Sequence, residues 1–386
     1  MTSSSLDAFC AAKLAQLDAA KLRRRLTVSD RRDGLWIERG GRQLLSFSCN
    51  DYLNLSHDPR VKAAAAAAVE RYGAGAGASR LVTGNHPLLE ALEAKLAAFK
   101  GTEAACLFGS GYLANTGITP ALVGAGDLVF VDELAHSCLW AGAQLSKAEI
   151  VPFPHNDMDA LEQLLRAKRA GARHALVLTD GVFSMDGDLA PLPELSRLCG
   201  DYDAWLLADD AHGLGIVGGG RGSARAFSPP PHVDLQMGTL SKAIGGYGAY
   251  LCASQSVVDW LHNRARSFVY STGLPPASIA AAIAALDVIE HDKKLIEKPL
   301  AKARAFTKSA GLPDPQSNIL PVTLGDETRA LRAAELLAGE GFLVVAIRPP
   351  TVPKGTARLR LTFTAGHPDD EIERLAHLVR TRILGK

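Results

Sequence analysis

Two charged residues, each at the end of an apolar run, are the side chains best placed to do chemistry. The apolar run 204–208 leads into Asp209, and a later apolar run leads into a loop that carries Lys242. A lysine amine can bond covalently to the aldehyde of pyridoxal phosphate, and a carboxylate can pair with the protonated nitrogen of its pyridine ring. The loop hydroxyls of Thr239 and Ser241, together with free N–H groups, can hold a phosphate. The pattern therefore predicts pyridoxal phosphate chemistry.

Both charged residues also have ordinary explanations. Most lysines are solvated surface charges, but Lys242 follows an apolar run and precedes the small, apolar residues 243–246. A lysine held away from water has a lowered pKa and can act as a base. Asp209 could instead cap the segment that follows it, and the adjacent Asp210 could compete for the ring nitrogen. The residues alone leave the choice between the two acids open.

The surrounding sequence indicates the elements that must position these side chains. Between about residues 50 and 273, short apolar runs alternate with helical patterns at 85–100, 136–146 and 157–169. The expected strands cover residues 128–131, 149–151, 174–178, 204–208 and 233–237. Such alternation predicts a mostly parallel sheet with helices on both faces. Ligands bind beyond the carboxyl ends of such strands, which is where Asp180, Asp209 and Lys242 fall.

The chain outside this region predicts a smaller α+β part. Apolar spacing predicts a lead-in helix over 5–26, and residues 35–47 alternate as a hairpin that turns at Gly40 and Gly41. Long helices are expected over 275–310, with strands and helices alternating beyond Gly311. We therefore expect an N-terminal helix and hairpin at 1–50 that packs with the small domain, a large cofactor-binding domain at 51–275, and a small domain at 276–386.

Composition excludes several classes of protein. The 386 residues are 47% hydrophobic and 22% charged, which is ordinary for a globular enzyme, and the net charge of +1 predicts no bulk attraction to nucleic acid or an anionic membrane. No run approaches 18 apolar residues, so no membrane span is expected. The six cysteines form no C-x-x-C pair, a pattern typical of reduced cytoplasmic thiols rather than of disulfides or a metal site. Arg23–25 could hint at a transit peptide, but Asp7 and Asp18 in the same stretch argue against one.

Five motifs in order make the chain resemble the α-oxoamine synthases, a branch of the aspartate-aminotransferase-like enzymes of pyridoxal phosphate fold type I. They are SCNDYL at 48–53, GVFSMDGD at 181–188, DDAHG at 209–213, GTLSK at 238–242, and IRPPTVP at 347–353 followed by TARLRLT at 356–362. The resemblance runs from about Leu22 to the C-terminus. It implies an α/β fold with a large domain built on a mostly parallel sheet and a smaller α+β domain.

The resemblance implies roles for the charged residues and for two histidines. Lys242 carries the cofactor and then acts as a base, and Asp209 rather than Asp210 pairs with the ring nitrogen. His212 donates a hydrogen bond to the cofactor's phenolic oxygen. His136 stacks on the cofactor ring and contacts the substrate carboxylate.

The resemblance also implies residues that bind the cofactor and the substrates. The phosphate is expected where a helix begins, because free N–H groups and the helix dipole favour an anion there. The residues expected to hold it are Ser110, Gly111, Tyr112, Thr239 and Ser241. Ser184 is expected near the cofactor ring, and Thr272 lies in a segment that reaches the neighbouring subunit's phosphate, which implies a homodimer with sites at its interface. The expected substrate-binding residues are Arg23, Asn50, His136, Arg348 and Thr351.

Three positions depart from the family or from simple motif rules. Asp180 stands where the family usually has glutamate. Its side chain is shorter by one methylene, so we expect a contact there to be longer or bridged by water. Asn54 replaces a common glycine, and asparagine tolerates the left-handed backbone. Residues 73–78 superficially match a dinucleotide fingerprint but follow a helical alanine run rather than a strand, so we interpret them as a loop on the substrate side.

The resemblance implies an acyltransferase of biotin biosynthesis. The expected reaction condenses L-alanine with pimeloyl-CoA or pimeloyl-acyl carrier protein, and carbon dioxide and the free thiol leave. The alternatives are a glycine C-acetyltransferase, a 5-aminolevulinate synthase, or a non-catalytic regulator. The segment 347–351 favours the alanine enzyme over the first two. No helix-turn-helix segment precedes residue 22, and the lysine, aspartate and histidines are intact, which argues against the regulator.

Overall fold

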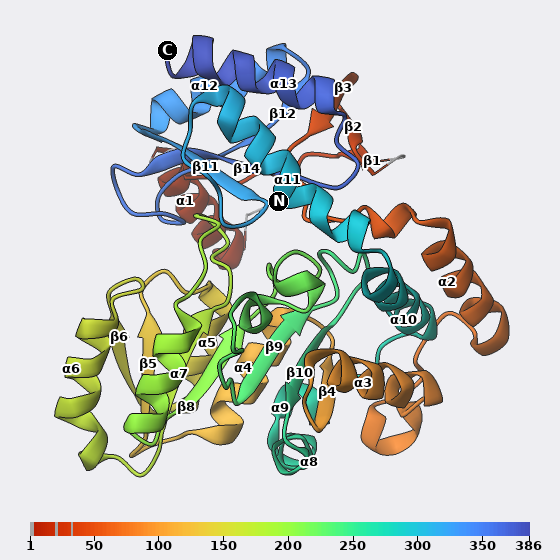
Figure 1. Cartoon of the computed structure of the whole chain (residues 1–386), viewed down its shortest axis with the longest axis vertical. Coiled ribbons are helices and arrows are strands. Elements are labelled where there is room, and N and C mark those ends of the chain that lie inside the picture. The colour runs from red at the N-terminus through yellow and green to blue at the C-terminus, as the bar shows by residue number, and fades with distance from the viewer. Residues whose placement is uncertain (1–3, 20–21, 32–33) are drawn as a thin grey trace.

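The computed structural model describes residues 4–19, 22–31 and 34–386. Figure 1 shows two parts, a larger one below and a smaller one above, with the N-terminal strands lying beside the smaller part. The described helices include none with the length and apolar character needed to cross a bilayer.

A seven-stranded sheet lies at the centre of the larger part, with strand order β4-β10-β9-β8-β7-β5-β6. Its strands are β4 (Ala104–Phe108), β5 (Leu128–Asp132), β6 (Glu149–Phe153), β7 (Ala175–Asp180), β8 (Trp205–Asp209), β9 (Leu235–Thr239) and β10 (Ala249–Ala253). Neighbouring strands from β9 to β6 are parallel, and β10 is antiparallel to both of its neighbours. The predicted mostly parallel sheet is therefore confirmed.

Helices cover both faces of this sheet. The helices of the larger part are α2 (Pro59–Tyr72), α3 (Pro87–Lys100), α4 (Gly111–Leu122), α5 (Ser137–Ser146), α6 (Met158–Lys168), α7 (Leu192–Asp201), α8 (Gln255–Arg264), α9 (Arg266–Val269) and α10 (Pro276–His291), of which α2 packs on α10 rather than on the sheet. Successive side chains of a strand point to opposite faces. Leu176 and Leu178 of β7 accordingly join a buried cluster with α4 and α5, whereas Val177 joins another with α6 and α7. A strand buried on both faces explains the unbroken apolar runs in the sequence.

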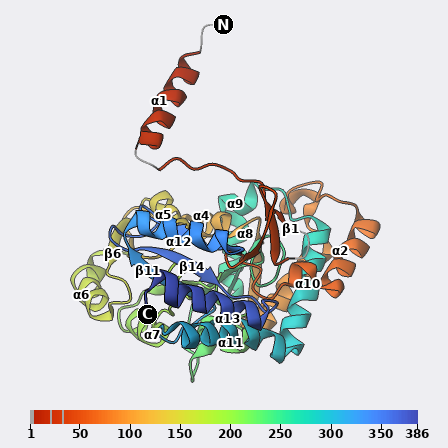
Figure 2. The same ribbon diagram turned by 90° about the horizontal axis from the view of Figure 1, so that it is seen from above.

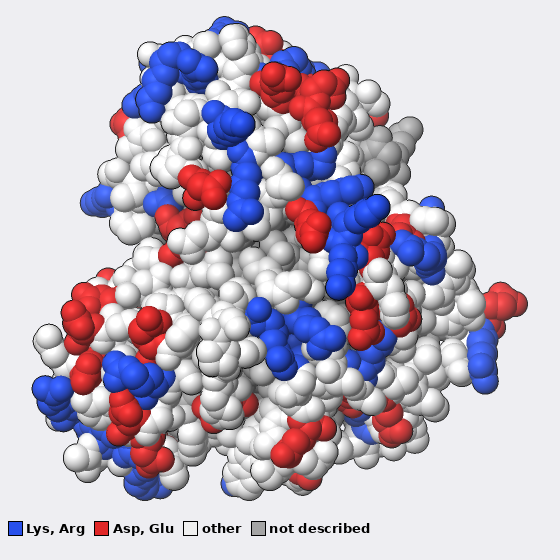
Figure 3. Space-filling view, in the orientation of Figure 1, with Lys and Arg blue, Asp and Glu red and all other residues white. Residues whose placement is uncertain are grey.

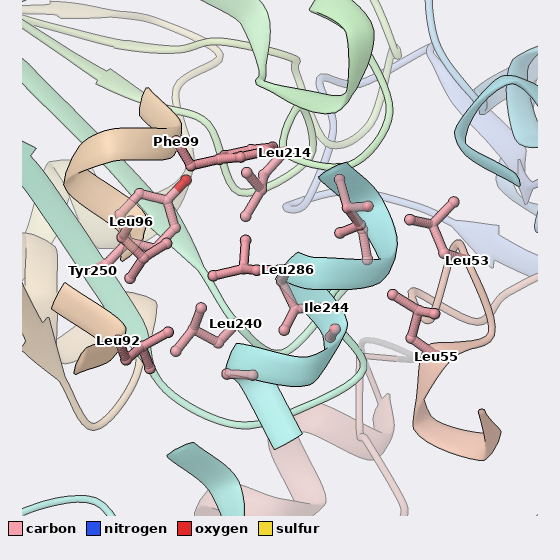
Figure 4. Close-up of a cluster of buried hydrophobic side chains, with 14 of the residues drawn as sticks. Leu53, Leu55, Leu92, Leu96, Phe99, Leu214, Leu240, Ile244, Tyr250 and Leu286 are labelled. Carbon is pink, nitrogen blue, oxygen red and sulfur yellow. The ribbon is translucent and has the colours of Figure 1, made fainter. Parts of the chain in front are cut away.

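A third buried cluster holds the loop after β9 in place. Figure 4 shows Leu92 and Leu96 of α3 and Leu286 of α10 in this cluster, together with Leu240 and Ile244. Leu240 and Ile244 are fully buried and flank Lys242 in the sequence. Packing of the residues on either side therefore fixes the position of the lysine-bearing loop.

The smaller part contains two sheets and three helices. Its sheets have the orders β1-β2-β3-β12 and β11-β14-β13. The strands are β1 (Asp30–Arg31), β2 (Trp36–Arg39), β3 (Arg42–Ser46), β11 (Ile319–Gly325), β12 (Phe342–Leu343), β13 (Val345–Ile347) and β14 (Ala357–Thr362), and the helices are α11 (Lys293–Ala310), α12 (Glu327–Gly339) and α13 (Asp369–Leu378). Strand β3 pairs in parallel with β12, and Leu45 and Phe47 join the buried cluster of this part.

The predicted hairpin over 35–47 is confirmed. Strands β2 and β3 pair antiparallel, and Gly40 and Gly41 between them both have positive φ angles, of 58° and 74°. A two-residue turn of this kind needs two left-handed residues, which glycine adopts without strain.

The N-terminal helix differs from its prediction. Helix α1 (Ser5–Ala19) is shorter than the expected 5–26, and residues 22–29 have no regular structure. Figure 2 shows α1 standing away from the rest of the chain, and none of its residues is buried. The apolar spacing that predicts this helix ends at Leu17, which agrees with the earlier helix end.

Charged side chains of both signs are interspersed over the face shown in Figure 3. Neither sign dominates that face, which agrees with the net charge of +1. The view offers no broad basic surface of the kind that binds a nucleic acid backbone.

Candidate active site

The carboxyl ends of neighbouring parallel strands bring the predicted chemical groups together. Asp180 ends β7 and Asp209 ends β8, and the two residues are direct partners in the sheet register. A cavity of about 180 Å³ lies beyond these ends. It is lined by Gly111, Tyr112, His136, Cys138, Asp180, Asp209, Ala211, His212, Thr239, Ser241 and Lys242. The structure therefore places the four predicted catalytic residues around one cavity.

The Lys242 amine lies in a mixed electrostatic environment. Its Nζ is 2.7 Å from Nε2 of His212. Burial lowers the pKa of Lys242 to about 8, against the opposing charges of Asp209 and Asp180. Near neutral pH a substantial fraction of the amine is therefore uncharged and able to attack an aldehyde.

His212 is held between this lysine and a buried tyrosine. Its Nδ1 lies 2.6 Å from the hydroxyl of Tyr52, and the same hydroxyl lies 3.2 Å from Oδ1 of Asn50. Burial, followed by the charge of Lys242, holds the pKa of His212 well below its usual range. The imidazole is therefore neutral, and its orientation is fixed from both ring nitrogens.

Asp209 receives a hydrogen bond at each carboxylate oxygen. The amide of Asn115 donates to Oδ2 at 2.7 Å, and the backbone N–H of Ala211 donates to Oδ1 at 3.0 Å. Asp210 faces elsewhere, in a buried ion pair with Lys100 at 2.7 Å. Of the two adjacent acids, only Asp209 lines the cavity.

The His136 ring has a defined tautomer. Its Nδ1 accepts the backbone N–H of Cys138 at 3.3 Å and lies 2.7 Å from the Cys138 thiol. A backbone N–H can only donate, so in the neutral ring the proton is on Nε2. Burial, partly opposed by the charge of Asp209, lowers the pKa of His136 and favours this neutral ring. Asp180 accepts the backbone N–H of His136 at 3.1 Å, and burial followed by the charge of Asp209 raises the pKa of Asp180 well above its usual range.

One end of the cavity is suited to an anion. Ser110 caps α4 by accepting the N–H of Leu113 at 3.2 Å, and Gly111 and Tyr112 begin the helix. The hydroxyls of Thr239, at the end of β9, and of Ser241, in the loop that follows, lie 2.8 Å apart and also line this cavity. A helix N-terminus with nearby hydroxyls is a typical phosphate site.

A second, larger cavity of about 750 Å³ adjoins the first at His136, which lines both. Its walls come from both parts of the fold and are mostly apolar. They comprise Arg24, residues 133–137, Trp140, residues 183–186 and residues 350–353. Besides His136, the predicted site residues Ser184 and Thr351 line this cavity.

Four other predicted residues are not among the described residues that line the two cavities. Arg23 pairs with Asp18 at 2.5 Å. Asn50 contacts Tyr52, and Arg348 precedes the wall formed by 350–353. Thr272 bridges to Ser79 and lines a separate small hollow. Their proposed roles therefore remain predictions.

The chain matches the aminotransferase class I and II family over residues 42–379. The chain belongs to this family. It is 64% identical to an 8-amino-7-oxononanoate synthase from Beijerinckia indica, over 97% of each chain. It is 65% identical to an 8-amino-7-oxononanoate synthase from Methylocella silvestris, over 89% of this chain and 98% of the relative. A solved variant of serine palmitoyltransferase from S. paucimobilis, with a bound aldimine of PLP (pyridoxal phosphate) and myriocin, is 28% identical, with a TM-score of 0.90 over 99% of this chain and 100% of that one.

These findings confirm the predicted fold type, the resemblance to the α-oxoamine synthases and pyridoxal phosphate as the cofactor. The residues that line the cavity of about 180 Å³ suit pyridoxal phosphate. It offers an amine, a carboxylate, two imidazoles and a helix N-terminus, which match the aldehyde, ring nitrogen, ring face and phosphate. A third hollow of about 620 Å³ lies at the opposite strand ends, near Gln236 and Ala253, and holds none of the predicted site residues.

Several residues at or near the candidate active site have no role that the sequence predicts. Asn115 of α4 is a fully buried amide, and a buried polar group needs a hydrogen-bond partner. Tyr52 and Arg360 lie within recognised motifs but had no assigned role. Arg360 is buried, donates from Nε to the carbonyl of Ser184 at 2.5 Å, and has no carboxylate partner among the described residues.

His155 connects two segments that adjoin the walls of the larger cavity. Its Nδ1 lies 3.1 Å from Asp132 at the end of β5, and its Nε2 lies 2.9 Å from Asp188. Both nitrogens donate only when the ring is charged. Burial opposes that charge, but hydrogen bonds to the two carboxylates outweigh it and raise the pKa of His155 to about 10. The charged ring therefore fastens the segment that carries Ser184 to the end of β5.

The Lys242 amine generates a first prediction. In cofactor-free protein, we expect the rate of covalent attachment of pyridoxal phosphate to rise roughly fivefold from pH 7 to 8, and less than about twofold from pH 8 to 9. A pKa near 8 makes about a tenth of the amine neutral at pH 7 and half at pH 8. Stopped-flow absorbance measures the rate, and Lys242→Ala is the blank. A tenfold rise per pH unit up to pH 9 would indicate an ordinary lysine and contradict the prediction.

His155 generates a second prediction. Because its pKa is raised, its stabilising effect is complete below about pH 6.5, the unfolded value, and is lost as the pH rises through about 10. His155→Gln should lower the free energy of unfolding by about 1.5–3 kcal/mol at pH 6.5, and the deficit should shrink by pH 10. Urea unfolding across this range measures both. The control is His232→Gln, an exposed ring paired with Asp234, which should change little. A deficit that does not depend on pH would show that the His155 ring is uncharged.

Proposed function

We propose that the chain condenses L-alanine with a pimeloyl thioester in biotin biosynthesis, releasing carbon dioxide and the free thiol and forming 8-amino-7-oxononanoate. The observation that carries the proposal is the junction of two cavities at His136. One holds the groups that pyridoxal phosphate needs, and the other has the volume and apolar walls for an extended acyl chain. The identity of 64–65% to relatives named 8-amino-7-oxononanoate synthase supports the same reaction.

The cofactor supplies a sink for the electrons left on the amino acid α-carbon. We propose that Lys242 holds it and, once freed, takes the α-proton and later returns one, because its lowered pKa leaves about a tenth of the amine neutral at pH 7. Asp209, fixed by Asn115 and Ala211, keeps a proton on the ring nitrogen. His212 is neutral and braced by Tyr52, so it can hydrogen-bond the ring's phenolic oxygen.

His136 is proposed to stack on the ring and to offer its Nε2–H to the substrate carboxylate. The tautomer set by Cys138 supports this donor role. Arg360 is a second candidate for that carboxylate, because its buried guanidinium has no carboxylate partner among the described residues. Ser184 and Thr351, in the walls of the larger cavity, are proposed to contact the cofactor ring and the acyl substrate respectively.

The remaining assignments complete the proposal. Ser110, Gly111, Tyr112, Thr239 and Ser241 are proposed to hold the phosphate, supported by the helix start and paired hydroxyls. Thr272 lies outside the cofactor cavity of its own chain, which is compatible with a contribution to the site of a second copy in a homodimer. Arg23, Asn50 and Arg348 are kept as proposed substrate contacts.

A matrix of substrates tests the proposed function. Alanine, glycine and serine are each combined with pimeloyl-, acetyl- and succinyl-CoA, and thiol release is measured with Lys242→Ala as the blank. We expect alanine with pimeloyl-CoA to exceed every other combination by at least about tenfold, a difference of about 1.4 kcal/mol in barrier. Preference for glycine with acetyl-CoA would replace the proposal with a glycine C-acetyltransferase, and preference for glycine with succinyl-CoA would replace it with a 5-aminolevulinate synthase.

A further inference from the structure

We propose that Arg24 is a specificity-determining residue that binds an anionic group of the acyl thioester substrate at the wall of the larger cavity. The inference rests on the proposed function, which supplies a substrate with two kinds of anion. One is the carboxylate at the far end of the pimeloyl chain, and the other is the phosphate of the thioester carrier. A guanidinium binds either through two parallel N–H bonds.

The direction of the Arg24 side chain follows from its place in the arginine run. Residues 22–29 have no regular structure, and Figure 2 shows them as a stretched connection between α1 and β1. In an extended chain, alternate side chains point to opposite sides. Arg23 and Arg25 both face Asp18, at 2.5 and 3.8 Å, whereas Arg24 lines the cavity. The three adjacent arginines therefore differ in surroundings although they are identical in type.

Arg24 is also the cation of this cavity that remains available. Asp186 in the wall is already neutralised by an ion pair with Arg358. In the described part of the chain, no carboxylate lies within ion-pair distance of Arg24. Glu133 also lines the cavity without being paired to it. An incoming anion would therefore meet a guanidinium that is not paired with any carboxylate of the described residues.

The rest of the cavity suits the uncharged length of such a substrate. Leu134, Trp140, Phe183, Met185 and Val352 give it apolar walls, and His136 opens it to the cofactor cavity. The methylene groups of an acyl chain are stabilised by burial against such walls, because apolar surface is removed from water. A guanidinium among apolar walls, in a cavity that adjoins the cofactor cavity, is an arrangement that can select an acyl chain carrying an anion at a distance from its thioester.

The test compares Arg24→Ala with Arg25→Ala in the holoenzyme. We expect Arg24→Ala to raise the KM for pimeloyl-CoA about ten- to a hundredfold with kcat within about twofold of wild type, since the contact is equal in ground and transition states. Arg25→Ala should leave both unchanged. Thiol release measures the rates, and the retained cofactor absorbance and thermal midpoint confirm that both variants fold.

Inhibition by substrate analogues then identifies the anion. Heptanoyl-CoA lacks the far carboxylate, pimeloyl-pantetheine lacks the phosphates, and heptanoyl-pantetheine lacks both. If Arg24 binds the carboxylate, Arg24→Ala weakens pimeloyl-pantetheine but not heptanoyl-CoA. If it binds a phosphate, the pattern is reversed. Weakening of heptanoyl-pantetheine by the same factor would show that charge is not involved and would overturn the inference.

Two failures are distinguishable. Wild-type protein that does not turn over alanine with pimeloyl-CoA overturns the proposed function and this inference with it. Wild-type protein that does so, with equal KM values for Arg24→Ala and Arg25→Ala, overturns the inference alone.

Discussion

The site depends on keeping a lysine amine away from water at the end of a parallel sheet. Burial lowers the pKa of Lys242 to about 8, and the negative charges of Asp209 and Asp180 limit the shift. The amine is neutral often enough to react, yet it lies beside a carboxylate that a cofactor ring nitrogen needs. Leu240 and Ile244 make this arrangement rigid, because their burial fixes the loop on both sides of the lysine.

The neighbouring groups are oriented by a set of specific partners. Both carboxylate oxygens of Asp209, both ring nitrogens of His212 and Nδ1 of His136 have hydrogen-bond partners. A catalytic group works only when its own geometry is held by a surrounding layer of contacts. His136 has a further importance, because it is the shared wall through which the cofactor cavity communicates with the larger one.

Much of this arrangement could be predicted from the sequence, for physical reasons. Apolar runs that end in charged residues are a strong signal for buried parallel strands, so the positions of Asp209 and Lys242 at strand ends could be predicted. The choice between Asp209 and Asp210 could not be made from the residues alone. It depends on Lys100, which lies in a distant helix and withdraws Asp210 into a buried ion pair. Asn115 was missed for the same reason, since its partner Asp209 is far away in the sequence. Cys138 was also missed, although its partner His136 is a near neighbour in the sequence. The arginine run shows a further limit, because only the three-dimensional path of the segment separates Arg24 from its neighbours.

The most direct test of the account compares turnover in Asp209→Asn and Asp210→Asn, with cofactor content and thermal midpoint measured on the same samples. Asp209→Asn should keep its fold and part of its cofactor, while turnover falls by more than about a hundredfold, because an amide does not hold a proton on the ring nitrogen. Asp210→Asn should lower the thermal midpoint, because it leaves the Lys100 charge buried without its partner, and should keep turnover within about tenfold of wild type. Turnover within tenfold of wild type in Asp209→Asn would contradict the account and show that this carboxylate is not the partner of the cofactor ring.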